Sequence, residues 1–255
     1  MSIMKIPKGK KVYFASDNHL GTPNLIESQK REKIFVKWLD KIKEDAHSIY
    51  LLGDLFDVWI EYKHVVPKGF VRVLGKLAEL VDNGIPVYFF VGNHDMWMKG
   101  YFEKELGIKV FHKPEQIELN SKKILLGHGD GLGPNDNGYK RLKKAFKNKL
   151  LQFIFRLIHP DIGLSIAKFL SNKNRLIYSG KDKFYSNPDD EWLVEYCKKK
   201  LLNNNIDYFI FGHRHLPLEI NLPKKSKYVN LGDWINYNSY ASFSEDKITL
   251  SYWNK

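Results

Sequence analysis

Five short blocks of the sequence carry side chains that bind metal ions, and each block directly follows a run of apolar residues. The candidate ligands are Asp17, His19, Asp54, Asn93, His128, His213 and His215. Imidazole suits transition metals such as manganese, iron or zinc, whereas carboxylate and amide oxygens suit harder divalent ions. Two ions with three or four ligands each need about seven donors with one shared, and the Asp54 carboxylate is the candidate bridge. The pattern therefore indicates a two-metal site.

The alternatives to such a site are weak when the blocks are taken together. A lone Asp-x-His pair is usually a surface turn, but five strand ends of the same kind point to one shared site. The single cysteine, Cys197, excludes an internal disulfide and a cysteine-rich zinc site. Structural zinc sites also favour cysteine and closed tetrahedra, so the donor set indicates chemistry rather than a structural ion.

The elements that must position these donors begin with the segment before the third block. Residues 87–91 form an apolar run, β-branched or aromatic, which predicts a central strand covered on both faces. Gly92 permits a sharp turn, so Asn93, His94 and Asp95 follow at the carboxyl end of the strand, where open α/β sheets bind ligands. Two roles stay open for Asp95: it orients His94, or it caps the following helix.

The first third of the chain alternates predicted strands and helices. The expected elements are strand 11–15, helix 25–44, strand 48–52, helix 67–83 and strand 87–91. Pro67 suits the first turn of its helix and Gly84 supplies the stop. A β-α-β-α-β order predicts a parallel sheet with right-handed crossovers.

The remaining strands are shorter and predict a second sheet. Segments 116–119 and 123–126 flank a turn at Asn120-Ser121, and segment 208–211 precedes His213 and His215. Segments 218–221, 227–231, 240–243 and 248–253 are expected to be antiparallel strands that close the domain. Two stacked sheets with helices outside are the expected packing, in a single domain spanning residues 1–255.

A helical insertion is expected at about residues 138–203, with helices at 139–158, 162–170 and 189–203. Residues 138–200 hold 15 lysine and arginine residues and 6 aspartate and glutamate residues, which gives a net charge of +9 out of the +12 of the whole chain. Interspersed apolar residues indicate a basic, apolar surface suited to a membrane interface. The alternative is a plain helical cap on the core.

Composition narrows the class of partner. The net charge of +12 and a pI near 9.4 predict attraction to polyanions such as nucleic acid, acidic lipid or a phosphorylated substrate. Residues 1–11 lack an apolar signal core, and no run approaches the roughly 18 apolar residues of a membrane span. A cytoplasmic protein is expected.

The blocks D-x-H, G-D, G-N-H-D, G-H and G-H-x-H occur in the order typical of the calcineurin-like metallophosphoesterase superfamily, which this sequence resembles. The resemblance implies a four-layer α/β/β/α sandwich and two divalent metal ions, commonly manganese. It implies one ion held by Asp17, His19, Asp54 and His215, and a second held by Asp54, Asn93, His128 and His213. It also implies catalytic roles for the bridging Asp54 and for His94, which assists the leaving group.

One branch of this superfamily, which cleaves UDP-2,3-diacylglucosamine in lipid A synthesis, is the most similar. The similarity lies in the segment 53–59, GDLFDVW, and in HGDGL at 128–132 followed by Asp136 and Tyr139. It implies a helical lid over two acyl chains, peripheral contact with the inner face of the inner membrane, and products UMP and 2,3-diacylglucosamine 1-phosphate. It also implies substrate contacts at Asn93, His94, Asp136 and Tyr139. The alternative for Asp136 is a helix cap, and for Tyr139 a packing residue.

The sequence departs from that branch at His94, where its best-known members have arginine, and at Arg214, where they have threonine. A metallophosphoesterase for another phosphodiester, such as a nucleotide or nucleic acid, is therefore the alternative. Nucleic acid is not the expected partner, because the chain shows no groove of aromatic residues with arginine and no recognised nucleic-acid module. A non-catalytic scaffold is the third hypothesis, although such proteins usually lose ligands and all seven are present here.

Overall fold

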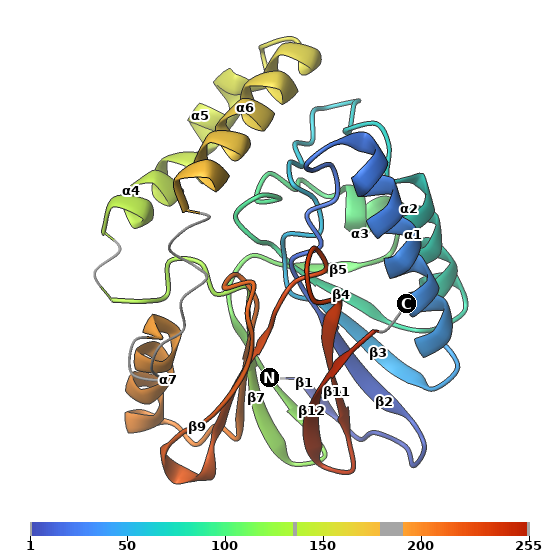
Figure 1. The fold of residues 1–255 in the computed structure, drawn as a ribbon, viewed down its shortest axis with the longest axis vertical. Coiled ribbons are helices and arrows are strands. Elements are labelled where there is room, and N and C mark those ends of the chain that lie inside the picture. The colour runs from blue at the N-terminus through green and yellow to red at the C-terminus, as the bar shows by residue number, and fades with distance from the viewer. Residues whose placement is uncertain (1, 135–136, 179–190, 254–255) are drawn as a thin grey trace.

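Two six-stranded sheets lie face to face in the computed structural model, which describes residues 2–134, 137–178 and 191–253 (Figure 1). The first sheet has the order β12 (Lys247–Tyr252), β11 (Ser239–Ser244), β2 (Lys11–Ala15), β3 (Ala46–Leu51), β4 (Val87–Phe90) and β5 (Lys109–Phe111). The second has the order β1 (Ser2–Met4), β6 (Glu115–Leu119), β7 (Lys122–Leu126), β8 (Tyr208–Phe211), β10 (Lys227–Leu231) and β9 (Pro217–Asn221). Phe14 and Tyr50 from the first sheet meet Ile124 and Val229 from the second in one buried cluster.

Helices cover the outer face of each sheet. On the first sheet, α1 (Leu25–Ile42) buries Phe35 and Trp38 together with residues of α2 (Val71–Asp82). On the second sheet, α7 (Trp192–Asn203) buries Leu193 and Cys197 against Phe209. These layers confirm the predicted four-layer α/β/β/α arrangement.

The second helix begins at Val71, so the prediction that Pro67 occupies its first turn was wrong. Phe70, the residue before the helix, has a left-handed φ of 57°. The Glu32 side chain on α1 then accepts hydrogen bonds from the backbone nitrogens of Arg72 and Val73, at 3.0 and 3.1 Å. A tertiary contact thus supplies acceptors for backbone N–H groups of the first turn, which have none within the helix, and sets the start of α2.

The predicted helix at 139–158 is two helices, α4 (Asn137–Phe146) and α5 (Lys149–Phe155). The break occurs at Asn148, whose side chain caps α5 by accepting from the backbone nitrogens of Leu150 and Leu151. The next helix is longer than predicted, as α6 (Pro160–Tyr178). The predicted start of the last helix at residue 189 lies outside the described residues, and α7 packs on the second sheet.

The strand pairing differs from the prediction at β10. It runs parallel to β8 and antiparallel to β9, because β9 lies at the edge of the sheet and β10 returns between the two. The parallel order β2, β3, β4 and the antiparallel hairpin β6–β7 are confirmed. Three short elements were not predicted, namely β1, β5 and α3 (Tyr101–Glu105), each at most five residues long.

The helices α4, α5 and α6 lie together beyond one end of the two sheets, whereas α7 lies beside the second sheet (Figure 1). Among the described residues, no single helix is both long and apolar enough to cross a membrane. Taken together, α5 and residues Pro160–Asn172 have the length and apolar composition of a membrane span, but the two segments are bent by 118° at the break between them.

Candidate metal centre

All seven predicted ligands follow the ends of strands that face one another across the two sheets. The first sheet contributes, after β2, β3 and β4 in turn, Asp17, His19, Asp54 and Asn93. The second sheet contributes, after β7 and β8, His128, His213 and His215. Because these five strands run parallel within their sheets, their carboxyl ends bring the side chains to one edge of the sandwich.

Five of these ligand candidates have left-handed backbone conformations. The φ values are 56°, 44°, 53°, 69° and 54° for Asp17, His19, Asp54, His213 and His215. A residue with a side chain adopts such a conformation at a cost of about 1–3 kcal/mol, and it persists where the surrounding structure over-determines it. The fold therefore holds these turns against their local preference, which is typical of a functional site.

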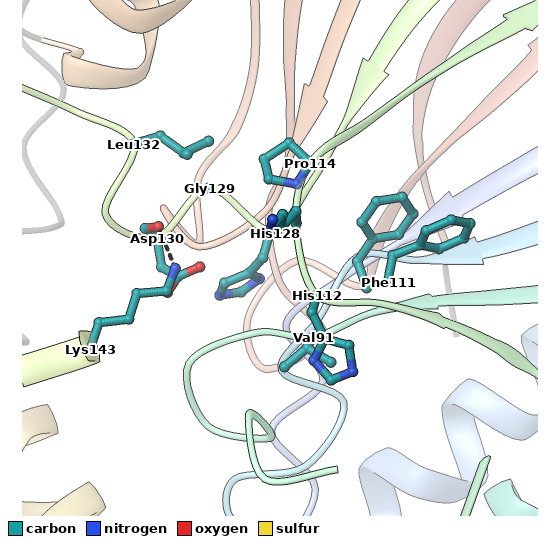
Figure 2. Close-up of a pocket in the computed structure, with 11 residues that line it drawn as sticks. Val91, Phe111, His112, Pro114, His128, Gly129, Asp130, Leu132 and Lys143 are labelled. Atoms are coloured by element: carbon teal, nitrogen blue, oxygen red, sulfur yellow. Dashed lines mark hydrogen bonds and ion pairs between the residues drawn. The ribbon is translucent and has the colours of Figure 1, made fainter. Parts of the chain in front are cut away.

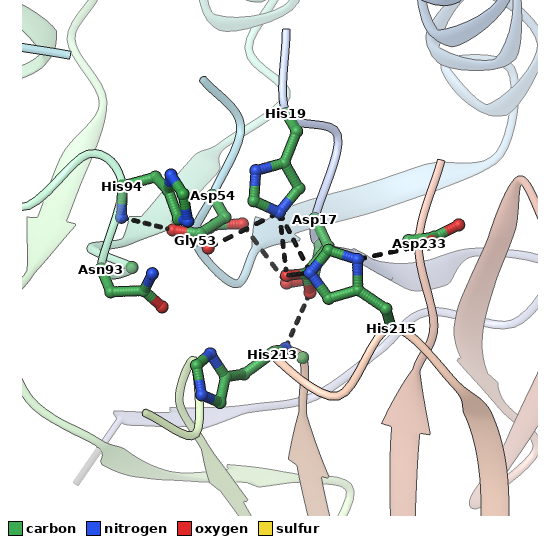
Figure 3. Close-up of polar contacts among 12 residues, drawn as sticks. Asp17, His19, Gly53, Asp54, Asn93, His94, His213, His215 and Asp233 are labelled. Carbon is green, nitrogen blue, oxygen red and sulfur yellow. Dashed lines mark hydrogen bonds and ion pairs between the residues drawn. The ribbon is translucent and has the colours of Figure 1, made fainter. Parts of the chain in front are cut away.

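The donors converge in three groups whose ligand atoms lie within 4.8 Å of one another. The groups are Asp17, His19 and His215; His19, Asp54 and His94; and Asp54, His128 and His213. Asp54 Oδ2 lies 3.2 Å from His128 Nε2 and 3.7 Å from His19 Nε2, so this carboxylate stands between donors from both sheets (Figure 3).

The close approach of Asp54 requires two glycines. A Cβ atom at Gly92 would lie 2.1 Å from Asp54 Oδ1, and one at Gly53 would lie 2.7 Å from His128 Nδ1. Gly53 also has a φ of 93°, which favours glycine. The glycines of the G-D and G-N-H-D blocks thus leave room for donors of neighbouring blocks.

Buried partners hold two of the histidines with Nε2 toward the centre. His128 Nδ1 donates to the Leu52 carbonyl at 2.8 Å, while its Nε2 lies 3.1 Å from Asn93 Oδ1. His215 Nδ1 lies 3.3 Å from Asp233 Oδ2. Such partners orient metal-binding histidines in known sites. Sequence reasoning missed Asp233, although Gly232-Asp233 follows the apolar strand β10 as the other blocks follow theirs.

Asp57 joins the centre to His94 and was also missed as a functional residue. His94 Nδ1 donates to the Asp57 carbonyl at 2.8 Å, and Asp57 Oδ1 lies 3.7 Å from His94 Nδ1 and 3.6 Å from His19 Nδ1. Its signal was present in the quoted segment GDLFDVW, where the second aspartate stands three residues after Asp54.

Asp95 takes neither of the two roles left open for it. Its carboxylate accepts hydrogen bonds from the backbone nitrogens of Gly92 at 2.7 Å and Leu55 at 3.0 Å, and thereby ties the loops after β4 and β3 together. Burial, with the nearby charge of Asp54, raises the pKa of Asp95 to about 7. Asp95 is therefore a scaffold residue of the centre.

The carboxylates and imidazoles of the centre are buried close together and shift one another's pKa values. Burial opposes ionisation of Asp17, yet the charge of His215 holds the pKa of this carboxyl well below its usual range. Burial would lower the pKa of His128 and His215, but the carboxylates of Asp54 and Asp17 raise each to about 10. His213 differs, because burial and the charge of His128 lower its pKa to about 4.

This donor set fits divalent cations. Asp17 Oδ1 is buried and accepts no hydrogen bond from the described residues, while it faces the Nε2 atoms of His19 at 3.6 Å and His215 at 3.3 Å. Those two Nε2 atoms lie 3.1 Å apart. Carboxylate oxygen and two ring nitrogens thus face one small space, and a divalent ion would satisfy all three.

A pocket beside His128 is lined by Asp130 and Lys143 (Figure 2), and Asp130 is the residue that the expected substrate contact Tyr139 reaches. The hydroxyl of Tyr139 donates to Asp130 Oδ2 at 2.7 Å, and Lys143 Nζ lies 2.5 Å from the same oxygen. Both partners of Asp130 lie on α4, so the insertion is tied to the loop after His128. Asp136, the other expected contact, lies outside the described residues.

Comparisons with known proteins agree with this centre. A family model described as calcineurin-like phosphoesterase matches residues 10–217. A UDP-2,3-diacylglucosamine hydrolase of Porphyromonas gingivalis is 37% identical over 252 residues, which cover 94% of this chain and 96% of that protein. A hydrolase of the same name from Yersinia pseudotuberculosis is 29% identical over 219 residues, 85% of this chain and 89% of that protein. With donors from all five blocks converging on one edge of the sandwich, the chain belongs to the calcineurin-like phosphoesterase family of hydrolases.

Proposed function

We propose that this protein hydrolyses the pyrophosphate of UDP-2,3-diacylglucosamine, giving UMP and 2,3-diacylglucosamine 1-phosphate. The observation that carries the proposal is the 37% identity with the Porphyromonas gingivalis hydrolase, which extends over 94% of this chain and so includes the helical insertion as well as the donor blocks. The basic, apolar insertion beside a cluster of metal-binding residues supports a substrate that is both lipid and phosphate.

The proposal assigns two divalent ions to the centre. Asp17, His19, Asp54 and His215 would hold one ion, and Asp54, Asn93, His128 and His213 would hold the other, with Asp54 shared. Mn²⁺ is the proposed metal, because it is common in the metallophosphoesterase family that this sequence resembles, and a mixed set of imidazoles with carboxylate and amide oxygens accommodates it. When bound, such ions stabilise the charge of a phosphate and lower the pKa of a coordinated water.

His94 is the proposed catalytic acid, and it would offset the charge on the departing oxygen. Its Nδ1 donates to the Asp57 carbonyl, so Nε2 is the nitrogen that remains for the substrate. Burial lowers the pKa of His94, whereas the negative charge of a bound pyrophosphate would favour the protonated ring. Negative charge grows on the leaving oxygen during phosphoryl transfer, and a proton at Nε2 would neutralise it.

Asn93, His94, Asp136 and Tyr139 are the proposed substrate contacts. Tyr139 reaches Asp130 in the loop that carries His128, so α4 would bring the sugar end of the substrate beside the centre. The helices α4, α5 and α6 would then act as a lid over the acyl chains.

The lid is also the proposed site of peripheral attachment to the cytoplasmic face of the inner membrane. Large apolar residues of α5 and α6, together with the short connection between them, are exposed: Leu150, Leu151, Phe153, Ile154, Leu157, Ile162, Ile166, Phe169 and Leu170. The surrounding lysines would add about 1 kcal/mol each at an anionic membrane surface. Exposed apolar residues next to basic ones support contact with lipid rather than with water.

The test is product identification. Purified protein with Mn²⁺ is incubated with UDP-2,3-diacylglucosamine or with bis-p-nitrophenyl phosphate, and the products are identified by mass spectrometry. UMP and 2,3-diacylglucosamine 1-phosphate from the lipid nucleotide are the expected products. Turnover of the generic ester alone would reject the lipid substrate and favour another phosphodiester.

A further inference from the structure

We propose that Ser171 of α6 is a positioning residue for His94, so that docking of the lid completes the geometry of the catalytic centre. The inference rests on the proposed role of His94 in phosphoester hydrolysis, but it does not depend on the lipid nature of the substrate. Ser171 lies 117 positions after Asp54 in the sequence and on a different structural unit from the metal-binding strand ends.

Ser171 makes its contact inside the protein. Its side-chain hydroxyl donates to Asp57 Oδ2 at 3.1 Å and lies 3.4 Å from His94 Nδ1. Both Ser171 and Asp57 are buried, with 7% and 5% of their surfaces exposed. A hydrogen bond to a buried carboxylate is stronger than one between neutral groups, so this contact can fix the orientation of Asp57.

The two oxygens of the Asp57 carboxylate face different partners. Oδ1 lies between the imidazoles of His19 and His94, at 3.6 and 3.7 Å, while Oδ2 receives the serine hydroxyl. The two rings meet edge to face with centroids 4.8 Å apart. By holding Oδ2, Ser171 would keep Oδ1 between the two rings, and the His94 ring would keep Nε2 turned toward the substrate.

The lid reaches this position through the loop that follows Asp54. Apolar contacts join that loop to α5 and α6 through Val58, Ile60, Trp97, Phe155 and Leu164. Arg156 Nε donates to the Glu61 carbonyl at 2.7 Å, which anchors the end of α5 to the same loop. Since this loop also carries Asp57, movement of the lid and orientation of the carboxylate are physically linked.

A merely structural serine and a positioning serine differ in what their loss affects. If Ser171 only stabilises the helix, its removal lowers the hydrolysis of every ester alike. If it positions His94, its removal affects esters with poor leaving groups most, because only these require the proton. Leaving-group dependence therefore separates the two roles.

The experiment compares Ser171→Ala with Ser171→Thr, which retains the hydroxyl, and with Ser165→Ala as the matched control. Ser165 lies on the same helix and is exposed, and its hydroxyl donates to the Asp161 carbonyl one turn away. Each variant is assayed on bis-p-nitrophenyl phosphate and on diphenyl phosphate, whose phenol is the poorer leaving group. Metal content and melting temperature are measured alongside.

For Ser171→Ala, we expect kcat on diphenyl phosphate to fall about tenfold, because this is the effect on the rate of losing one hydrogen bond to a charged group. On bis-p-nitrophenyl phosphate the fall is expected to be less than about twofold, since the better leaving group needs little proton transfer. Ser171→Thr and Ser165→Ala should resemble the wild type. Equal losses on both esters, or no loss on diphenyl phosphate, would overturn the proposal.

Two measurements keep this test separate from the proposed function. In a His94→Gln background, Ser171→Ala should cause no further loss on diphenyl phosphate, and an additive loss would overturn the proposal. Proton NMR of the metal-free protein should show shifted His94 ring signals in Ser171→Ala relative to the wild type, because the Asp57 carboxylate beside the ring is no longer held by the serine hydroxyl. An unchanged His94 signal would overturn it even if no ester is hydrolysed. If the wild-type protein hydrolyses aryl esters normally but does not hydrolyse UDP-2,3-diacylglucosamine, the proposed substrate is rejected while the proposed role of Ser171 stands.

Discussion

Replacing both Phe153 and Leu157 with serine should weaken binding of the protein to anionic vesicles and leave the hydrolysis of a small soluble ester unchanged. Phe153 lies on α5 and Leu157 lies in the connection that follows it, with 60% and 71% of their surfaces exposed. Phe155 stands between them in the same apolar run of the sequence. The structure separates it, because Phe155 packs against Trp97 with ring centroids 4.8 Å apart.

The magnitude follows from the exposed area. Full burial of a leucine or phenylalanine side chain is worth about 1.5–3 kcal/mol. With roughly two thirds of each side chain still available for burial in lipid, the pair would contribute about 2–4 kcal/mol. Since about 1.4 kcal/mol corresponds to a tenfold change in affinity, vesicle binding should weaken about 30-fold or more.

The assay is co-sedimentation with vesicles of phosphatidylethanolamine and phosphatidylglycerol, run beside hydrolysis of bis-p-nitrophenyl phosphate. Leu202→Ser is the matched control, because Leu202 is 75% exposed but lies on α7, away from α5 and α6 (Figure 1). Phe155→Ser is a second comparison. It should lower the free energy of unfolding by up to about 3 kcal/mol through loss of packing.

Two results would refute this reasoning. If the Phe153 and Leu157 variant binds vesicles as tightly as the wild type, the exposed face of α5 does not contact lipid. If Leu202→Ser weakens vesicle binding to the same extent, the effect reflects general surface hydrophobicity and not a docking face.

Three further predictions concern the centre and the core. Asp54→Asn should abolish hydrolysis of every ester while the protein remains folded by circular dichroism, because the shared carboxylate is lost; residual turnover above a hundredth of the wild-type rate would contradict its assigned role. Metal binding at pH 7 to 8 should release protons, because the pKa values of His128 and His215 near 10 leave both rings protonated in the metal-free protein and ligands must be neutral. Apparent metal affinity should therefore rise with pH between about 7 and 10, which calorimetry in buffers of different ionisation enthalpy measures, and a pH-independent affinity would argue against these ligands. Cys197 should resist alkylation at pH 8 until the protein is unfolded, because it is fully buried and burial raises the pKa of its thiol; rapid labelling of the native protein would contradict this packing of α7.

Local sequence patterns were enough to predict most of the strands and the donors that follow them. The predicted bounds of β2, β8 and β10 agree with the structure, because each is an apolar or alternating run that ends at a turn or a polar residue. Strand ends with Asp, Asn or His are visible in the sequence because the ligand and its strand are adjacent. Five such blocks required a common site, and the fold brings all of them together.

Features that depend on contacts between residues far apart in the sequence could not be predicted from local patterns. The start of α2 at Val71 depends on hydrogen bonds to Glu32 of another helix, whereas Pro67 had predicted a start four residues earlier. The parallel pairing of β10 with β8 depends on where the β9–β10 hairpin returns, which no local pattern encodes. Short elements such as β1 form only because a neighbouring strand supplies their hydrogen bonds.

By itself, then, the sequence determined the type and order of the donors, the layered architecture and the basic, apolar character of the insertion, since each depends on neighbouring residues. Only the tertiary structure decided which buried groups orient those donors. Asp233 behind His215, and Asp57 between His19 and His94, acquire their roles from contacts across the fold. Ser171 reaches Asp57 from 114 residues away, and such a contact exists only once α6 has packed on the loop after β3.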